Sequence, residues 1–320
     1  MLEYIIVIVS ILSVESIFLS QYLHKENDGD KDSEMDMLDN TVSKPKRVKA
    51  KALLDLKFIN NSSDFITQMN IMISLLNSLK NNFRNLHLIK EFCEKYSLNF
   101  KIVNEVLSLI SQLKTLCVDI FRLNKNIWSS NIEQPNSRNQ LLLFQIILGG
   151  LIDNIARKKV IYNNNGNEVN EVKSKGESDN KRKIIYECNE NNVECQIHSE
   201  SMVSKETPNF VAYKEIIQEK NKANLITVMS VQPEWIFNLG GDLINYSFDN
   251  LNVNLEPIYS SKDDLIYCFI NMKYGYKSWE INNIKVDMTD SNSNDVVYRW
   301  FARLLLEGKI IDRFKVSLFP

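Results

Sequence analysis

The chain has 320 residues, a hydrophobic content of 44% and a formal net charge of -2. That length allows two or three small domains with ordinary cores, and the near-neutral charge excludes a global basic field that would attract nucleic acid. The five cysteines are scattered and odd in number, which argues against a secreted disulfide framework and favours a reducing compartment.

The apolar run from Leu2 to Leu19 predicts a buried core helix. A signal peptide would need a basic segment before the apolar one, and the only early charge is Glu3. A membrane-spanning helix needs about 20 apolar residues, and this run is broken at Glu15. A membrane-anchored or secreted protein led by residues 1–20 is the weaker alternative.

Residues 24–51 have the composition of a disordered, charged linker. Seven acidic side chains lie between Lys25 and Asp39, and five basic ones follow between Lys44 and Lys51. The basic run also fits a phosphate-contacting arm or a nuclear localisation signal, although short runs of this kind often match by chance.

Apolar residues at helical spacing predict a small helical bundle over residues 52–160. The first stripe starts at Phe65, for which Asp64 is a candidate N-cap, and the second runs from Ile102 to Ile120. A third stripe runs from Leu148 to Ile155 and ends in the basic residues 157–159, which suit the last turn of a helix. We expect each stripe to be core.

Residues 161–183 are rich in Asn, Gly and Lys and predict a disordered insertion. After them, short β-branched and aromatic runs predict the strands of a small barrel over residues 184–247. Those runs are residues 184–188, 193–197, 210–217 and 225–231. A strand at Leu265–Ile270, a polar insertion at 289–295 and a helix at 296–307 stopped by Gly308 predict a mixed α/β extension over residues 248–320.

The sequence contains no motif for autonomous catalysis. It has neither a GxxxxGK[S/T] phosphate loop nor a DExH tetrad, and its three histidines lie in no recognisable nucleophile motif. Cys188, Cys195 and His198 form a C-x6-C-x2-H pattern, which is looser than the usual zinc spacings and lacks a fourth ligand. We therefore expect no metal site and no cofactor in this chain.

Several segments, taken in chain order, carry a resemblance to one family. They are Tyr4–Val14 (YIIVIVSILSV), Phe92–Val103 (FCEKYSLNFKIV) with Glu105, Gln112 and Leu113, Leu148–Arg157 (LGGLIDNIAR), Val193–His198 (VECQIH), Pro208–Tyr213 (PNFVAY) and Val231–Trp235 (VQPEW). The first three resemble the helical, ratchet-like helicase-associated domain of the DEAH-box RNA helicases. The others resemble the OB-fold of the same family. Each piece alone is weak, but their order and approximate spacing match.

The tail narrows this resemblance to a subfamily. Trp279–Val286 (WEINNIKV) and Tyr298–Gly308 (YRWFARLLLEG) are similar to the carboxy-terminal extension of the nucleolar DEAH helicases of small-subunit ribosome assembly. The resemblance implies an accessory region that closes a channel around single-stranded or pre-ribosomal RNA, docks ribosome-assembly factors and serves pre-rRNA processing in the nucleus and nucleolus. ATP and magnesium would be needed only if a motor lies upstream.

The resemblance also implies an α+β chain in six parts. They are the first helix of the helicase-associated domain (1–23), the linker (24–51), the helical ratchet-like domain (52–160), the insertion (161–183), an OB-fold barrel (184–247) and the mixed α/β extension (248–320).

The same resemblance supplies candidate binding residues. The RNA contacts would be His198, Ser199, Ser201, Lys205 and Lys222, and the partner-docking residues Trp279, Phe301 and Arg303. For His198, a strand-end residue bound to its own loop is an equally open alternative, and Arg303 also fits a surface ion pair.

Three departures weaken the case for phosphate contact. Glu200 replaces a neutral residue of the family's His-Pro-Ser-Ser, and its carboxylate would repel phosphate. A basic position of the family is Ile226 here, and an aromatic one is Asn224.

The missing motor motifs leave two functional hypotheses. In the first, the chain is part of a longer RNA-dependent ATPase whose motor precedes it. In the second, it is a motorless adaptor derived from a helicase, which binds RNA or a pre-ribosomal protein without catalysis.

Overall fold

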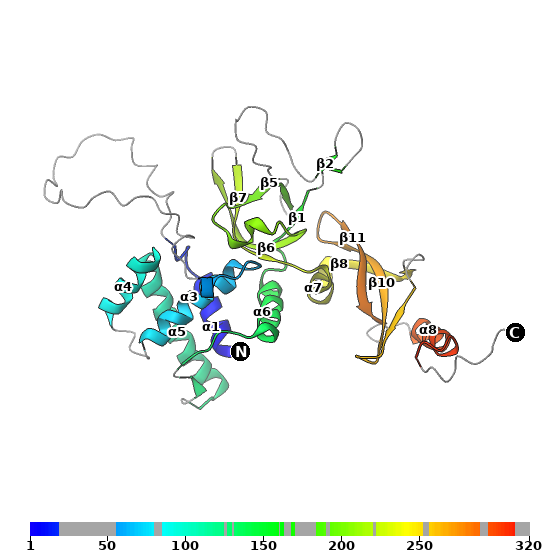
Figure 1. Ribbon diagram of the computed structural model, residues 1–320, viewed down its shortest axis with the longest axis horizontal. Helices are drawn as coiled ribbons and strands as arrows, with labels where there is room; N and C mark the ends of the chain where they lie inside the picture. Colours follow the sequence, from blue (N-terminus) through cyan, green and yellow to red (C-terminus); the bar gives the residue numbers. More distant parts are fainter. Residues whose placement is uncertain are drawn as a thin grey trace.

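The computed structural model describes residues 1–18, 56–79, 85–124, 127–129, 131–159, 161–162, 168–169, 184–189, 193–219, 222–251, 256–288 and 294–310. Helices gather at one end of the molecule, a small barrel lies beside them, and a second sheet with the last helix lies at the far end (Figure 1). This is the α+β architecture that the sequence predicts, with a closed five-stranded barrel.

The helical domain is built from amphipathic and apolar segments. Its helices are α1 (Leu2–Leu12), α3 (Asp64–Leu79), α4 (Leu86–Tyr96), α5 (Phe100–Phe121) and α6 (Ser137–Gly150), with a 3-10 turn η1 (Leu56–Phe58) before α3. The apolar stripes predicted from Phe65 and from Ile102 are confirmed as α3 and α5, but Ile120, at the end of the second stripe, is 69% exposed.

Helix α1 is part of the core, as its sequence predicts. It packs on α3 and α5, and Ile6, Val7 and Ile8 are almost completely buried. Within the described residues, no helix is long and apolar enough to cross a membrane.

The helices start at polar caps. The side chains of Asn85, Asn99 and Asn136 accept hydrogen bonds from backbone N–H groups in the first turns of α4, α5 and α6. At α3 the Ser63 hydroxyl accepts from the Ile66 N–H at 3.3 Å. The prediction that Asp64 caps this helix is therefore wrong, and its carboxylate is available for another partner.

The helix predicted from Leu148 to Ile155 is wrong beyond Gly150. Gly149 and Gly150 have low helix propensity, and α6 ends there. After four intervening residues the chain forms β1 (Ile155–Lys158), whose apolar start is buried in the barrel rather than on a helix face. Arg157 therefore lies on a strand, where its guanidinium binds Glu187 of the adjacent strand through Nε at 3.0 Å and Nη2 at 2.5 Å.

The barrel closes in the strand order β1-β4-β5-β7-β6. Its remaining strands are β4 (Tyr186–Cys188), β5 (Glu194–Ile197), β6 (Phe210–Glu219) and β7 (Lys222–Ser230), which confirms the predicted strands. All neighbours are antiparallel except β5 and β7, which are parallel. A 3-10 turn η3 (Met202–Lys205) follows β5, and α7 (Pro233–Leu239) follows β7 with Pro233 in its first turn.

The extension is a twisted sheet with a terminal helix. After a 3-10 turn η4 (Gly241–Leu243), the strands β8 (Ile244–Leu251), β9 (Ile258–Ser260), β10 (Leu265–Tyr274) and β11 (Trp279–Asp287) form the sheet, and α8 (Asn294–Leu306) follows. The predicted strand at Leu265 and the predicted helix before Gly308 are confirmed.

Other predictions fall largely outside the described residues. The linker at 24–51 lies outside them, and so do most of the insertion at 161–183 and residues 289–293. Within the insertion, β2 (Ile161–Tyr162) pairs with β3 (Glu168–Val169).

Gly275 sits where the extension meets the barrel. Its φ of +71° lies in the left-handed region, and a Cβ there would be 1.8 Å from the Asn189 amide nitrogen. Asn189 in turn accepts the Lys277 N–H at 3.2 Å. Only glycine therefore lets this turn approach the barrel.

We predict opposite effects for two Gly→Ala substitutions. Gly275→Ala should lower the free energy of unfolding by about 2 kcal/mol, because it adds left-handed strain and an overlap with Asn189. Gly149→Ala should raise it by about 0.5–1 kcal/mol, because an alanine there meets no atom within 4 Å and favours the helix. Urea unfolding of both variants measures the difference, and equal stabilities would contradict the packing described here.

Candidate functional site

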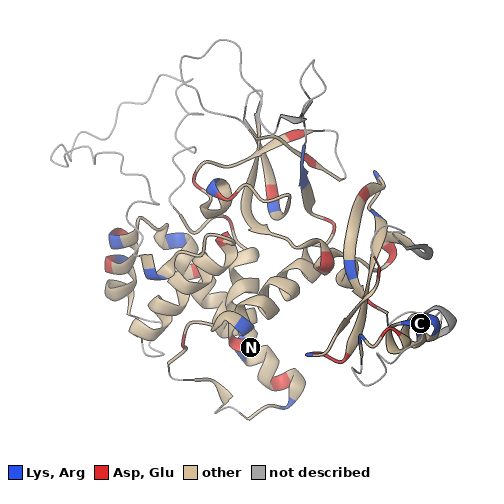
Figure 2. Ribbon diagram, turned by 45° about the vertical axis from the view of Figure 1, so that its right-hand side comes forward, with Lys and Arg blue, Asp and Glu red and all other residues tan. Residues whose placement is uncertain are grey.

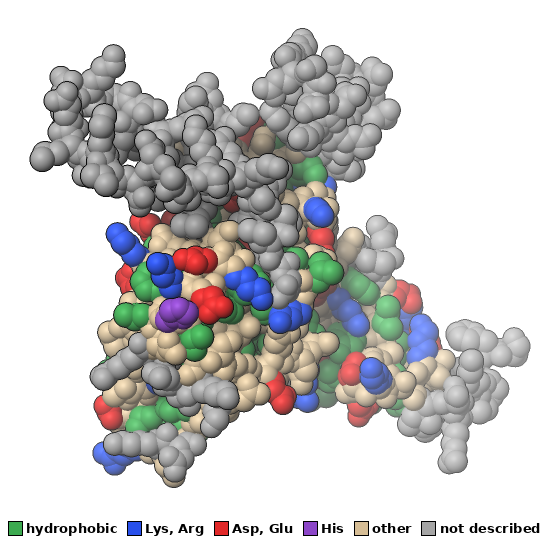
Figure 3. Space-filling view, turned by 60° about the vertical axis from the view of Figure 1, so that its left-hand side comes forward, with side chains coloured by type: hydrophobic (Ala, Val, Ile, Leu, Met, Phe, Trp, Pro, Cys, Tyr) green, Lys and Arg blue, Asp and Glu red, His purple; other side chains and the backbone are tan. Residues whose placement is uncertain are grey.

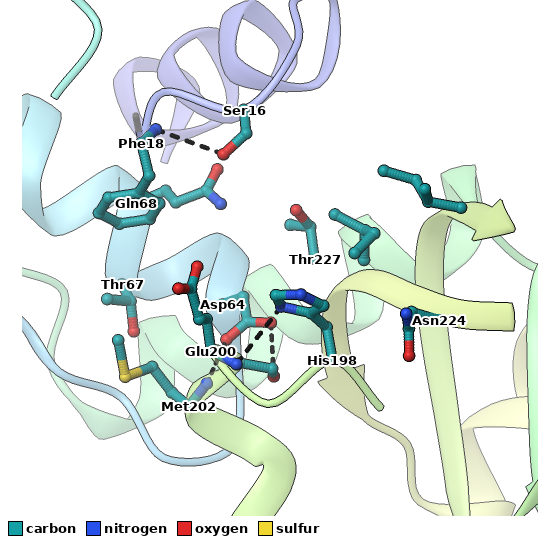
Figure 4. Close-up of a pocket in the computed structure, with 13 residues that line it drawn as sticks. Ser16, Phe18, Asp64, Thr67, Gln68, His198, Glu200, Met202, Asn224 and Thr227 are labelled. Carbon is teal, nitrogen blue, oxygen red and sulfur yellow. Dashed lines mark hydrogen bonds between the residues drawn. The ribbon is translucent and has the colours of Figure 1, made fainter. Parts of the chain in front are cut away.

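A hollow lies between the helical domain and the barrel, with a volume of about 150 Å³. Five segments line it (Figure 4): the chain after α1, the start of α3, the loop from β5 into η3, strand β6 and strand β7. The lining residues are Ser16, Phe18, Asp64, Thr67, Gln68, His198, Glu200, Ser201, Met202, Ile217, Asn224, Ile226 and Thr227.

The Asp64 carboxylate ties the two domains together at the floor of this hollow. It is 7% exposed. Its Oδ2 accepts the Ser201 hydroxyl at 2.7 Å and the Val228 N–H at 2.9 Å, and its Oδ1 accepts the Met202 N–H at 2.8 Å. A buried carboxylate is stable only when its oxygens are satisfied in this way, and its place in the first turn of α3 adds the favourable helix dipole.

Thr227 holds a strained backbone beside this carboxylate. Its φ is +51°, a conformation that β-branched residues rarely adopt and that costs about 1–2 kcal/mol. The next N–H along the chain, that of Val228, donates to Asp64. The strain therefore coincides with the point where β7 meets α3.

Further contacts join the same two domains. The half-buried Lys214 ammonium donates to the Val14 carbonyl after α1, and desolvation lowers the pKa of Lys214. The Ser230 N–H donates to the Ser62 carbonyl at 2.8 Å, and the Ser62 hydroxyl lies 3.1 Å from a Glu206 carboxylate oxygen. The barrel is therefore held against α1 and the start of α3 at several points.

The structure brings together some of the predicted RNA-binding residues. His198 lines the hollow; its N–H donates to the Leu225 carbonyl at 3.1 Å, and its Nδ1 accepts the Glu200 N–H at 3.3 Å. Both proposed roles of His198 are thus compatible with its place. Ser201 also lines the hollow, but it is 6% exposed and its hydroxyl donates to Asp64.

Two of the remaining three, Ser199 and Lys205, are not among the residues that line the hollow. Ser199 and Lys205 are exposed, Lys205 at the end of η3. Lys222 begins β7, two residues before Asn224, and its side chain lies outside the described set.

Sequence reasoning missed Asp64 and Gln68 as site residues. They are one helical turn apart on α3, so both face the barrel. The sequence did carry a signal for these two residues. Polar residues four apart on an otherwise apolar helix face indicate a buried polar contact. What they contact could not be deduced, because Asp64 and Ser201 are 137 residues apart.

The predicted docking residues are divided between two places. Trp279 is 3% exposed, and the Arg157 guanidinium lies 5.0 Å from its ring centroid, so it belongs to the packing of the extension on the barrel. Phe301 on α8 is 44% exposed. Arg303 binds Glu256 at 2.8 Å and Glu307 at 2.7 Å, which fits the surface ion pair. Basic and acidic residues both occur along the strands of the extension (Figure 2).

The Cys188 and Cys195 thiols lie together in the barrel core, with sulfur atoms 3.6 Å apart. The hydrogen bond from Cys195 lowers the pKa of Cys188, and Lys277 lowers it further. In the described part of the chain, no group of three or more His, Cys, Asp or Glu residues could hold a metal ion.

Two protein families match the chain. Residues 1–68 match the helicase-associated domain (HA2), ratchet-like, and residues 143–243 match the oligonucleotide/oligosaccharide-binding (OB)-fold. The matched ranges contain α1 and the start of α3 on one side and all five barrel strands on the other. Together with the closed barrel, they define a ratchet-like helicase-associated domain joined to an OB-fold.

Known relatives agree with this class. The chain is 28% identical to rha-2 of Caenorhabditis elegans, described as an ATP-dependent RNA helicase, over 70% of this chain and 18% of the relative. It is 28% identical to the human RNA helicase DHX37 over 69% of this chain and 17% of the relative. It is 22% identical to the Arabidopsis thaliana RNA helicase DEAH13 over 96% of this chain and 24% of the relative.

In its domains and its relatives, the chain is thus similar to the carboxy-terminal accessory region of DEAH-box RNA helicases. It spans between 17% and 24% of the length of these relatives.

We predict that Asp64→Ala lowers the free energy of unfolding by about 3–5 kcal/mol, because it leaves three buried donors without their acceptor. Asp119→Ala is the matched control, since Asp119 is exposed on α5, and it should change stability by less than about 0.5 kcal/mol. Chemical denaturation of the two variants tests this; an Asp64→Ala variant as stable as the control would mean that the carboxylate does not join the domains.

Proposed function

We propose that this chain closes a single-stranded RNA channel in an ATP-dependent DEAH-box helicase that acts in pre-rRNA processing and small ribosomal subunit assembly. The observation that carries the proposal is the rigid joint between a ratchet-like domain and an OB-fold, with a hollow at their meeting point. OB-folds hold single strands with basic grooves and stacking surfaces, and a fixed second domain gives such a groove its other wall.

The charge distribution limits how the RNA is held. Lys and Arg are interspersed with Asp and Glu on the face shown in Figure 3, so that face offers no single basic patch. Phosphate contacts would therefore come from separate cations such as Lys205, and affinity for RNA should be modest and salt-dependent.

The extension supports the further proposal that the tail docks a ribosome-assembly protein, with the nucleolus as its site of action. On α8, Tyr298, Phe301 and Leu306 expose 67%, 44% and 59% of their surfaces. Aromatic side chains of this kind are frequent anchors at protein interfaces.

A motorless adaptor derived from a helicase is the second candidate. An immunoblot of the native product with an antibody against residues 279–308 separates the two. A band far above 37.2 kDa would support the helicase, and a band at 37.2 kDa would support the adaptor.

We predict that the chain binds single-stranded RNA more tightly than duplex RNA. Lys205→Ala should weaken binding and reduce the slope of log K against log salt by about one, because one phosphate contact is lost. Lys262→Ala is the control, since Lys262 is exposed on the extension between β9 and β10, and it should leave the slope unchanged. Fluorescence anisotropy across a salt series measures both, and failure of the wild-type chain to bind would overturn the proposal.

A further inference from the structure

We propose that the hollow at the joint receives one nucleobase of a single RNA strand, and that the Gln68 side-chain amide binds the edge of that base. The inference rests on the proposed RNA-binding function. The inference goes beyond that function because it assigns the hollow to a base rather than to phosphate. It also assigns recognition of that base to Gln68.

The Gln68 side chain is largely buried, and its amide has no hydrogen-bond partner among the described residues. Its side chain is 5% exposed and lines the hollow, and its amide points toward the open space in Figure 4. No hydrogen bond joins this amide to any other group in the described part of the chain. A buried amide of this kind has a cost unless something pairs with it, so an unpartnered one facing a hollow indicates a ligand.

The amide has the chemistry of a base reader. It offers an acceptor and two donors side by side in one plane, which is the pattern that Asn and Gln use to bind the edge of adenine. On the opposite side of the hollow, the Glu200 N–H donates to His198 Nδ1 at 3.3 Å, which orients the imidazole ring there.

The walls suit a flat, uncharged ring. Phe18, Met202, Ile217 and Ile226 line the hollow with apolar or aromatic surface. Unstacked bases are held in proteins between such side chains.

The described lining disfavours phosphate. Among the described side chains that line the hollow there is no Lys or Arg, whereas Asp64 and Glu200 both line it. The Asp64 oxygens are occupied by their three donors, which leaves Glu200 as the carboxylate nearest to any ligand. A phosphate would therefore meet repulsion without a counter-charge, and it must stay outside while the base enters.

The test compares a short single-stranded oligoribonucleotide with a matched oligomer of abasic ribose phosphates. Fluorescence anisotropy gives the affinity of each for the full chain across a salt series. Gln68→Leu replaces the amide side chain with an apolar side chain of similar size. Gln218→Leu is the matched control, because Gln218 is exposed on the barrel next to Ile217.

We expect Gln68→Leu to weaken binding of the base-bearing oligomer by about tenfold, which is the size of one well-placed base contact. Its affinity for the abasic oligomer and the slope of log K against log salt should not change, and Gln218→Leu should behave as wild type. Ile226→Trp, which fills the hollow from the barrel side, should give the same selective loss. Thermal unfolding of each variant confirms that it folds.

Two results would overturn the inference while leaving RNA binding intact. In one, Gln68→Leu and Ile226→Trp bind the base-bearing oligomer as wild type does. In the other, they lose affinity for both oligomers equally, which is the effect of a lost fold or phosphate contact. Wild-type chain that binds neither oligomer would instead overturn the proposed function itself. Binding of an arginine-rich peptide, with RNA affinity unaffected by Gln68→Leu, would assign the hollow to a protein partner and also overturn the inference.

Discussion

The joint between the two domains depends on one buried charge. Asp64 places a carboxylate at the first residue of α3. The barrel supplies three donors to it from two segments, the turn at Ser201 and Met202 and the strand at Val228. A carboxylate in a poorly hydrated place is costly unless each oxygen is bound, so the two domains are stable together only in the arrangement that satisfies it. The carboxylate therefore acts less as a source of stability than as a selector of one geometry.

That geometry creates the hollow and its strain. The loop after β5 must turn inward to present Ser201 and Met202, which also brings His198 and Glu200 to the same space. Strand β7 must present Val228, and Thr227 takes a positive φ beside it. With Lys214 and Ser230 adding contacts on either side, a shift of the barrel would break several hydrogen bonds at once. A site shared by two domains keeps its shape only when they are joined in this way.

The sequence predicts the helices and strands better than the long-range contacts between them. Apolar spacing is a local property, so α3, α5 and the strands of the barrel follow from it. The third stripe misleads because Leu148 and Ile155 are both buried and seven residues apart, although one lies on a helix and the other on a strand across the Gly149–Gly150 break. His198 was found because residues 193–198 resemble a segment of the family's OB-fold. Asp64 was assigned to a local cap, because its true partners are more than 130 residues away.

The three departures from the family pattern acquire a common meaning in the structure. Glu200 lies in the loop after β5, whereas Asn224 and Ile226 both lie on β7, yet all three line the one hollow. Ile226 stands where the family has a basic residue, Asn224 where it has an aromatic one, and Glu200 where it has a neutral one. Each exchange makes the hollow less suited to phosphate. They leave it able to hold a neutral group with hydrogen-bonding edges, and Gln68 faces that group from the helical side. Cations outside the hollow, such as Lys205, would then attract the RNA phosphates. Side chains inside the hollow would discriminate among the bases. The two contributions differ in salt dependence, because only the phosphate contacts release counterions.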